Sequence, residues 1–155
     1  MLFFLNFIFY VLINIFSYLA HYFYKYLKMI NKIQFELEFI IKSSKKMLYN
    51  YISTPGALSE WFAEDVDLDD NIFTFHWEGS EEQAKIISHI PGKSIKFKWL
   101  EDKEEATFVE LKIQEDELTK DLALIITDFA YEDELEEAKL LWESQINDLH
   151  AIIGV

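Results

Sequence analysis

Side chains able to do chemistry are few in this sequence, and none forms a recognised catalytic or metal-binding pattern. Three of the four histidines, His76, His89 and His150, have no metal-ligand spacing and do not pair with a Ser or Cys as a catalytic dyad would. The acidic runs lack the Asp/Asn and Gly periodicity of a calcium loop. The chain has no cysteine, which excludes disulfides, thiol catalysis and cysteine zinc sites. We therefore expect no metal, no cofactor, and histidines that lie at the surface or at strand edges.

Two polar positions remain as candidates for a binding site. Gln145 interrupts the apolar face of a predicted C-terminal helix, and a buried amide needs hydrogen-bond partners. Either a residue of the sheet satisfies it, which we favour, or it points into a cavity and meets a ligand or water. Asp128 lies near the end of the last predicted strand. It is either a polar group at the mouth of a cavity or, as we favour, a hydrogen-bond acceptor where the helix begins.

The element that must position Gln145 is a long amphipathic helix, predicted over 133–153. At about 100° per residue, one arc collects its apolar side chains: Leu135, Ala138, Leu141, Trp142, Ile146, Leu149, Ile152 and Ile153. A helix with so wide an apolar stripe must be covered by another part of the fold.

The cover is a predicted sheet. The sequence predicts seven strands, at 33–41, 66–68, 73–77, 83–90, 95–99, 107–113 and 122–129. Most of them alternate apolar and polar residues, and the last is apolar on both faces. Two short helices follow the first strand, with Ser43 or Ser44 as the N-cap of one and Thr54 as the N-cap of the other. Hairpin links make the sheet antiparallel, and helices that do not interleave it make the fold α+β.

We expect a cavity where the sheet faces the long helix. Its predicted lining is Trp61, Phe62, Phe73, Phe75, Trp77, Phe97, Trp99, Leu141, Trp142 and Gln145, with Asp128 at the mouth. An apolar pocket with a few convergent polar groups is the general form of a small-molecule site. The alternative is that the rings fill the space as a packed core. For any single ring this is the better expectation, and we expect Trp142 to be structural.

Charge divides the chain into two parts at about residue 28. Residues 1–28 carry only Lys25 and Lys28, so the rest holds 12 lysines against all 28 acidic residues. Such a domain repels phosphate backbones, which excludes nucleic acid as a partner. No arginine occurs, so bidentate clamps on carboxylate or phosphate are also absent.

The first 28 residues have two interpretations. Leu2 to Tyr24 carries no charge and is long enough for a transmembrane helix, which Lys25, Lys28 and Lys32 would orient with the domain at the inner, cytoplasmic face. A polar stripe on this helix, formed by Asn6, Asn14, Ser17 and His21, suggests self-association or a partner helix. Alternatively, translation starts at Met29 and residues 1–28 are a mis-assigned start. We expect a separate domain over 29–155.

Several segments of that domain are similar to one known family: Ile52-Ser53-Thr54-Pro55 with Trp61-Phe62, the run from Ile90 to Trp99, Ile126-Thr127-Asp128-Phe129, and Trp142 to Leu149. They resemble the START-like, or helix-grip (SRPBCC), superfamily. The branch they resemble contains homologues of the heat-shock-protein ATPase activator and polyketide cyclase-like proteins. The resemblance covers about residues 30–153. It implies a curved antiparallel sheet of about seven strands around the C-terminal helix, with two short helices after the first strand.

The resemblance implies a function without fixing it, because one fold serves many functions. Our first hypothesis is a cytoplasmic, non-catalytic protein that binds a hydrophobic small molecule or lipid between sheet and helix. The second is a co-chaperone-like interaction module with a protein partner or a second copy of itself. The third is a cyclase- or dehydratase-like enzyme, ranked last because no acid–base pair is identifiable.

Overall fold

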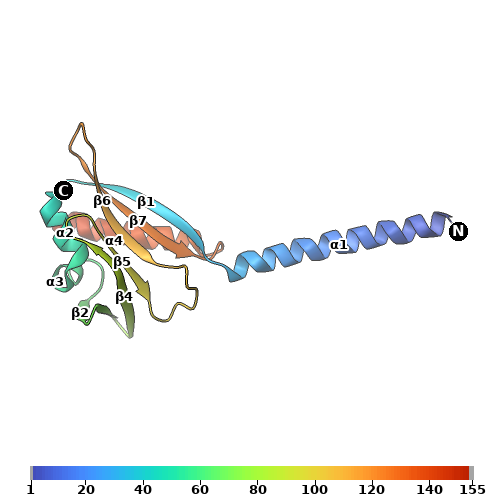
Figure 1. Ribbon diagram of the computed structural model, residues 1–155, viewed down its shortest axis with the longest axis horizontal. Coiled ribbons are helices and arrows are strands. Elements are labelled where there is room, and N and C mark those ends of the chain that lie inside the picture. The colour runs from blue at the N-terminus through green and yellow to red at the C-terminus, as the bar shows by residue number, and fades with distance from the viewer. Residues whose placement is uncertain (1, 154–155) are drawn as a thin grey trace.

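The computed structural model describes the backbone of residues 2–153 and the side chains of residues 10–24, 26 and 31–153. Its elements are α1 (Leu2–Ile30), β1 (Ile33–Ile41), α2 (Lys45–Ser53), α3 (Pro55–Leu58), β2 (Asp65–Asp69), β3 (Ile72–Trp77), β4 (Ser80–Ile90), β5 (Ser94–Trp99), β6 (Val109–Glu115), β7 (Leu122–Ala130) and α4 (Leu135–Ile153). Figure 1 shows α1 pointing away from a domain that contains every other element.

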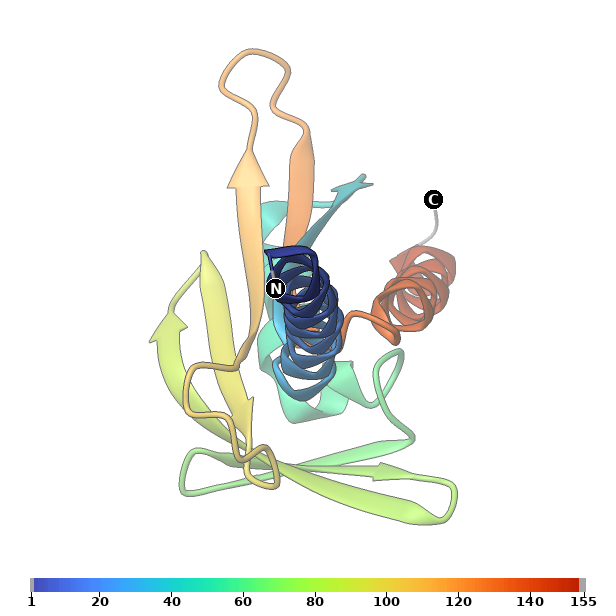
Figure 2. The ribbon, with the colours of Figure 1, turned by 90° about the vertical axis from the view of Figure 1, so that its right-hand side faces the viewer.

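One antiparallel sheet holds all seven strands in the order β1-β7-β6-β5-β4-β3-β2. The first and last strands of the chain, β1 and β7, are neighbours and pair over their full length, from Ile33 with Ala130 to Ile41 with Leu122. Figure 2 shows the sheet curving so that α4 lies on its concave side. The predicted α+β helix-grip fold, with two short helices after the first strand, is therefore confirmed.

Local sequence explains the tight turns and the curvature of the sheet. Asp70 and Asn71 join β2 to β3 with positive φ at both positions, 47° and 65°, as a two-residue hairpin of type I′ requires. Gly79 turns the chain from β3 into β4 with a φ of 81°, which a residue without a Cβ adopts freely. The register of β4 against β5 shifts between Ile86 and Ser88, and such a bulge bends a strand.

Two local predictions are confirmed, and one needs correction. Ser44 is the N-cap of α2, because its hydroxyl accepts a hydrogen bond from the Met47 backbone N–H at 3.2 Å. Thr54 is the N-cap of α3 through its backbone carbonyl, which accepts from the Leu58 N–H at 2.9 Å, while its hydroxyl donates back to the Asn50 carbonyl at 3.0 Å. The strand predicted from residue 107 begins only at Val109, since Thr107 is held in the preceding loop with its hydroxyl 2.8 Å from the Asp102 carboxylate.

The core lies between the concave face of the sheet, the short helices and one side of α4. Its most completely buried large side chains are Phe73, Phe75, Phe97, Leu48, Ile52, Leu58, Ile95, Leu111, Leu124, Ile126, Ile146 and Leu149. They come from α2, α3, four strands and α4, so burial of this one cluster holds the layers together.

The described side chains of α1 are exposed throughout, among them Tyr10, Phe16 and Phe23 at 67, 76 and 63%. In the part of the chain with described side chains, no helix is long and apolar enough to cross a bilayer. The predicted span from Leu2 to Tyr24 begins with residues 2–9, and their side chains, including that of Asn6, lie outside the described part. The Asn14 side chain donates to the Tyr10 carbonyl of its own helix at 2.8 Å.

Candidate functional site

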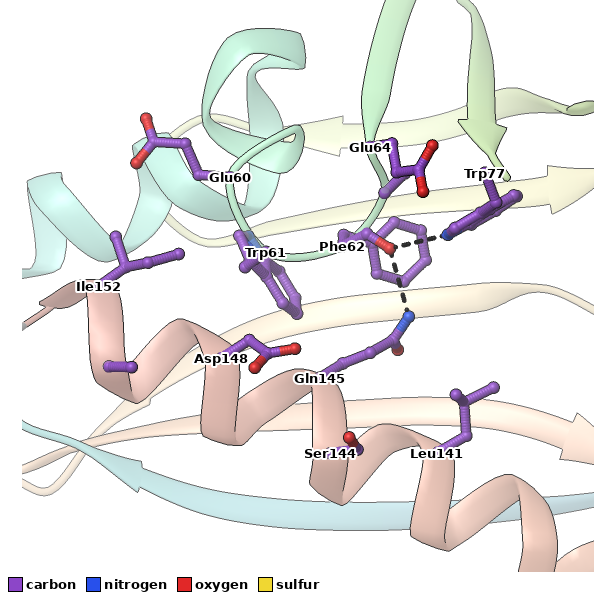
Figure 3. Close-up of a pocket in the computed structure, with 12 residues that line it drawn as sticks. Glu60, Trp61, Phe62, Glu64, Trp77, Leu141, Ser144, Gln145, Asp148 and Ile152 are labelled. Carbon is purple, nitrogen blue, oxygen red and sulfur yellow. Dashed lines mark hydrogen bonds between the residues drawn. The ribbon is translucent and has the colours of Figure 1, made fainter. Parts of the chain in front are cut away.

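Two neighbouring pockets lie between α4 and the sheet. The first, the Glu60 pocket, has a volume of about 550 Å³ and is lined by Glu60, Trp61, Phe62, Ala63, Glu64, Trp77, Leu141, Ser144, Gln145, Asp148, Ala151 and Ile152 (Figure 3). The second, the Asp128 pocket, has a volume of about 410 Å³ and is lined by Phe62, Trp77, Ser80, Glu82, Trp99, Val109, Asp128, Leu141, Trp142 and Gln145. Four residues belong to both linings, so the pockets share a wall.

Gln145 forms part of that shared wall. Its side-chain N–H donates to the Phe62 backbone carbonyl at 3.3 Å, and the Trp77 indole N–H donates to the same carbonyl at 3.2 Å. Figure 3 shows Gln145 reaching from α4 toward the segment that carries Trp61 and Phe62. The partner is therefore a backbone group of the segment after α3, not the sheet residue that we favoured, and the same side chain also lines both pockets.

Asp128 links the last strand to the long helix at the bottom of its pocket. The Trp142 indole N–H donates to Asp128 Oδ2 at 2.8 Å, and the Phe129 backbone N–H donates to Asp128 Oδ1 at 2.7 Å. Burial raises the pKa of Asp128 above its ordinary value of 3.8, against the opposing effect of these two hydrogen bonds and of the Lys32 charge. The Asp128 carboxyl thus acts as a hydrogen-bond anchor for α4 and as a polar group of the pocket.

Trp142 is buried, with an exposed fraction of 5%, and its ring stacks on that of Phe62 with centroids 5.6 Å apart. The indole therefore packs through its face and is anchored through its nitrogen. Leu141, the next residue on α4, lines both pockets but is 60% exposed. The apolar arc of the helix is wider than the surface that covers it.

The predicted aromatic lining divides into rings that line a pocket and rings that lie outside both pockets. Phe73, Phe75 and Phe97 are at most 1% exposed and belong to neither lining. Phe75 packs against the lining rings, with its centroid 5.1 Å from Phe62 and 5.3 Å from Trp99. The three phenylalanines therefore form the core behind the lining rings.

The two pocket linings together contain all four tryptophans of the chain; Trp61 and Trp142 are buried, and Trp77 and Trp99 are half-buried. Trp61 faces the Glu60 pocket, and its indole N–H donates to the Tyr51 carbonyl at 2.9 Å. Trp77 and Trp99 face the Asp128 pocket on adjacent parts of the sheet, with ring centroids 6.3 Å apart. Every tryptophan signal of the protein therefore reports on this site.

Sequence reasoning missed four carboxylates of the site. Glu60, Glu64 and Asp148 line the Glu60 pocket, and Glu82 lines the Asp128 pocket, whereas none of the four was among the predicted lining residues. Spacing could have identified two of them. Asp148 follows Gln145 by three residues and so lies on the same side of α4, and Glu82 precedes buried Ala84 by two residues and so shares its face of β4.

The histidines lie outside both pockets. His76 is between Asp67 and Glu81, at 3.1 and 3.5 Å, and the ring of His89 stacks on that of Tyr49 and is hydrogen-bonded to its hydroxyl. His150 differs from the expected surface position, because its Nε2 is buried with no hydrogen-bond partner among the described residues. Within that same part of the chain, no cluster of three or more His, Asp and Glu side chains could hold a metal ion.

A curved antiparallel sheet around a long C-terminal helix, with pockets between the two, defines a START-like domain. The family model for the START-like superfamily domain matches residues 29–155, and the chain belongs to this superfamily. A search of curated protein sequences found no match.

Solved structures agree with this assignment. The solution structure of BfR322 from Bacteroides fragilis is 36% identical, with a TM-score of 0.58 over 81% of this chain and 94% of that one. The Aha1 dimer from Colwellia psychrerythraea is 16% identical, with a TM-score of 0.67 over 79 and 97%. CalU16 from Micromonospora echinospora is 17% identical, with a TM-score of 0.62 over 79 and 75%. At these lower identities the last two show the fold, and they are consistent with the predicted branch.

Proposed function

We propose that this domain binds a hydrophobic small molecule or lipid, without transforming it, in the two pockets between the sheet and α4. The observation that carries the proposal is the shared aromatic wall: Phe62 and Trp77 line both pockets, and the rings of Trp61, Trp99 and Trp142 extend it on either side. Volumes of about 550 and 410 Å³ fall within the range of roughly 300–1,000 Å³ typical of small-molecule sites.

One weak contact contributes to the separation of the two pockets. The hydrogen bond from Gln145 to the Phe62 carbonyl is 3.3 Å long, and a bond of this kind contributes about 0.5–1.5 kcal/mol net. Because Gln145 is only half-buried on α4, a rotation of its side chain joins the pockets without moving the helix. A longer ligand can then occupy both pockets, with the Gln145 amide free to meet a polar group of the ligand.

Native mass spectrometry of the full chain, purified without detergent, tests this proposal directly. We expect a bound small molecule that leaves on denaturation. A chain that is empty and remains empty when offered apolar compounds contradicts the proposal. Conversion of the identified ligand during incubation would assign a cyclase- or dehydratase-like reaction instead.

A matched pair of variants tests the role of Gln145. In Gln145→Leu the amide is lost, and we expect weaker binding of a hydrophobic ligand with a polar head. Asn147→Leu makes the same kind of change at an exposed position of α4 outside both linings, and we expect unchanged binding. Equal affinity of the two variants removes the role assigned to Gln145.

A second candidate function is a protein contact, favoured by one observation on α4. Leu140 and Leu141 are adjacent and 63 and 60% exposed, which leaves an apolar strip beside the pockets. Of the structural neighbours, Aha1 was solved as a dimer, so a second copy of this chain is one occupant to test. Light scattering of the wild type and of Leu140→Lys would show whether this strip joins two chains.

A further inference from the structure

We propose that the ligand is a hydrophobic organic cation, such as a protonated amine on an aromatic or aliphatic body, held between the tryptophans and carboxylates of the Asp128 pocket. This inference rests on the proposed function and adds to it the charge of the ligand. Three features of the site support it: the negative sign of its charges, its aromatic walls, and the strand register that places a carboxylate beside the aromatic rings.

The charged side chains of both pockets have one sign. Glu60, Glu64 and Asp148 line the first pocket, Glu82 and Asp128 line the second, and no lysine with a described side chain belongs to either lining. Lys32 and Lys103 lie in a neighbouring pocket that shares Glu82 and Trp99. The whole chain has a formal net charge of −14, which adds to the same potential. Carboxylates outnumber these lysines around the two pockets, so a carboxylate or phosphate ligand would meet net repulsion, whereas a cation would meet net attraction.

The walls of the Asp128 pocket suit the same kind of ligand. The rings of Trp77 and Trp99 lie with centroids 6.3 Å apart at an angle of 50°, and Phe62 and Trp142 complete the lining with rings 5.6 Å apart. The negative face of an aromatic ring attracts a cation, and tryptophan does so most strongly. The same rings also offer apolar area to the uncharged body of the ligand.

Strand register places a carboxylate beside this pair of rings. Trp77 on β3 is opposite Ser80 on β4, and Trp99 on β5 is opposite Ala84, so the residue between them on the same face of β4 is Glu82. Side chains two residues apart on a strand share a face, which puts Glu82 in the row between the two tryptophans. An ammonium group in this position lies beside two tryptophan rings and one carboxylate.

Three probes that share a naphthalene ring test the proposal on the full chain: 1-naphthylmethylamine, 1-naphthalenemethanol and 1-naphthoate. Binding is read from the indole N–H signals of the four tryptophans. Because α1 has no tryptophan, binding of a probe to that helix does not contribute to these signals. We expect the amine to bind at least about tenfold more tightly than the alcohol, and the naphthoate most weakly. Equal affinity of amine and alcohol, or tighter binding of the naphthoate, overturns the cation proposal while leaving the pocket proposal in place. If none of the three moves the indole signals, both proposals fail.

A pair of neutralised carboxylates locates the effect. Glu82→Gln keeps the size of the side chain and removes its charge, so we expect about fivefold weaker binding of the amine and unchanged binding of the alcohol. Glu81→Gln is the control, because Glu81 is the neighbouring residue on β4, lies outside both linings and has its carboxylate 3.5 Å from His76. The ratio of amine to alcohol affinity stays at the wild-type value in Glu81→Gln. If it also stays there in Glu82→Gln, the assigned position of the cation is wrong.

Discussion

Trp142 carries the connection between α4 and the sheet, so its replacement tests the structure of the site most severely. In Trp142→Ala the side chain is removed from a position that is 5% exposed and stacked on Phe62, and large-to-small changes of this kind cost about 3–5 kcal/mol of unfolding free energy. In Trp142→Phe an aromatic ring remains over Phe62, but the hydrogen bond of 2.8 Å to Asp128 is lost. A hydrogen bond to a charged group contributes about 1.5–3 kcal/mol, and we expect a loss of that size.

Urea unfolding followed by circular dichroism measures both losses, because the change in tryptophan content alters fluorescence but not the helix and strand signal. Trp99→Phe is the matched control, since Trp99 is half-buried and has no hydrogen bond to a carboxylate among the described side chains, and we expect it to lose less than about 1 kcal/mol. A loss below about 1 kcal/mol in Trp142→Ala would mean that this ring is not part of a packed core. A Trp142→Phe variant as stable as the wild type would refute the anchoring role of Asp128.

Three further predictions concern stability. Burial raises the pKa of Asp128 in the folded state above its ordinary value of 3.8. The contribution of Asp128 to the free energy of unfolding is therefore complete below pH 3.8 and is lost as pH rises through the higher folded-state pKa. We expect the stability of the wild type relative to Asp128→Asn to fall with rising pH. Asp102 gives the opposite pH dependence. Burial raises the pKa of Asp102, but hydrogen bonds from Lys32 and Thr107 outweigh burial and lower this pKa overall. The contribution of Asp102 to the free energy of unfolding is therefore present above pH 3.8 and is lost as pH falls through the lower folded-state pKa. Urea titrations of the wild type, Asp128→Asn and Asp102→Asn across acidic to neutral pH measure both effects. We expect the stability differences from the wild type to change with pH in opposite directions for the two variants, and changes in the same direction would contradict our reasoning. Asn71→Val forces a β-branched residue to a φ of 65° and costs about 1–2 kcal/mol, whereas Asn71→Gly at the same turn does not, and thermal melts that rank the two alike would contradict the strain argument.

Alternation and turn chemistry made most of the fold predictable from the sequence. The strand at 33–41 alternates apolar and polar side chains from Ile33 to Phe39, and Asp70-Asn71 is a turn signal that the hairpin between β2 and β3 uses directly. The ends of elements were less predictable, because they depend on tertiary contacts. Thr107 reads as a strand residue in isolation, but a hydrogen bond to Asp102 keeps it in a loop.

The site was less predictable than the fold, because a repeating pattern gives the face of a residue but not its depth. Phe73 and Trp77 share a face of β3, yet only Trp77, nearer the end of the strand, reaches a pocket. The helical period likewise assigned Leu141 to the apolar arc of α4, but it could not show that the rest of the fold leaves this side chain exposed. The partner of Gln145 is a backbone carbonyl 83 residues earlier in the chain, and no side-chain pattern encodes such a contact.

The central claim is that the pockets between the sheet and α4 bind an apolar molecule, and the indole N–H spectrum of the full chain tests it most directly. With 1-naphthalenemethanol as the titrant, we predict that the signals of Trp77, Trp99 and Trp142, which line the Asp128 pocket, shift together along one saturating curve. Indole signals that stay in place while the probe binds elsewhere on the chain would contradict the claim.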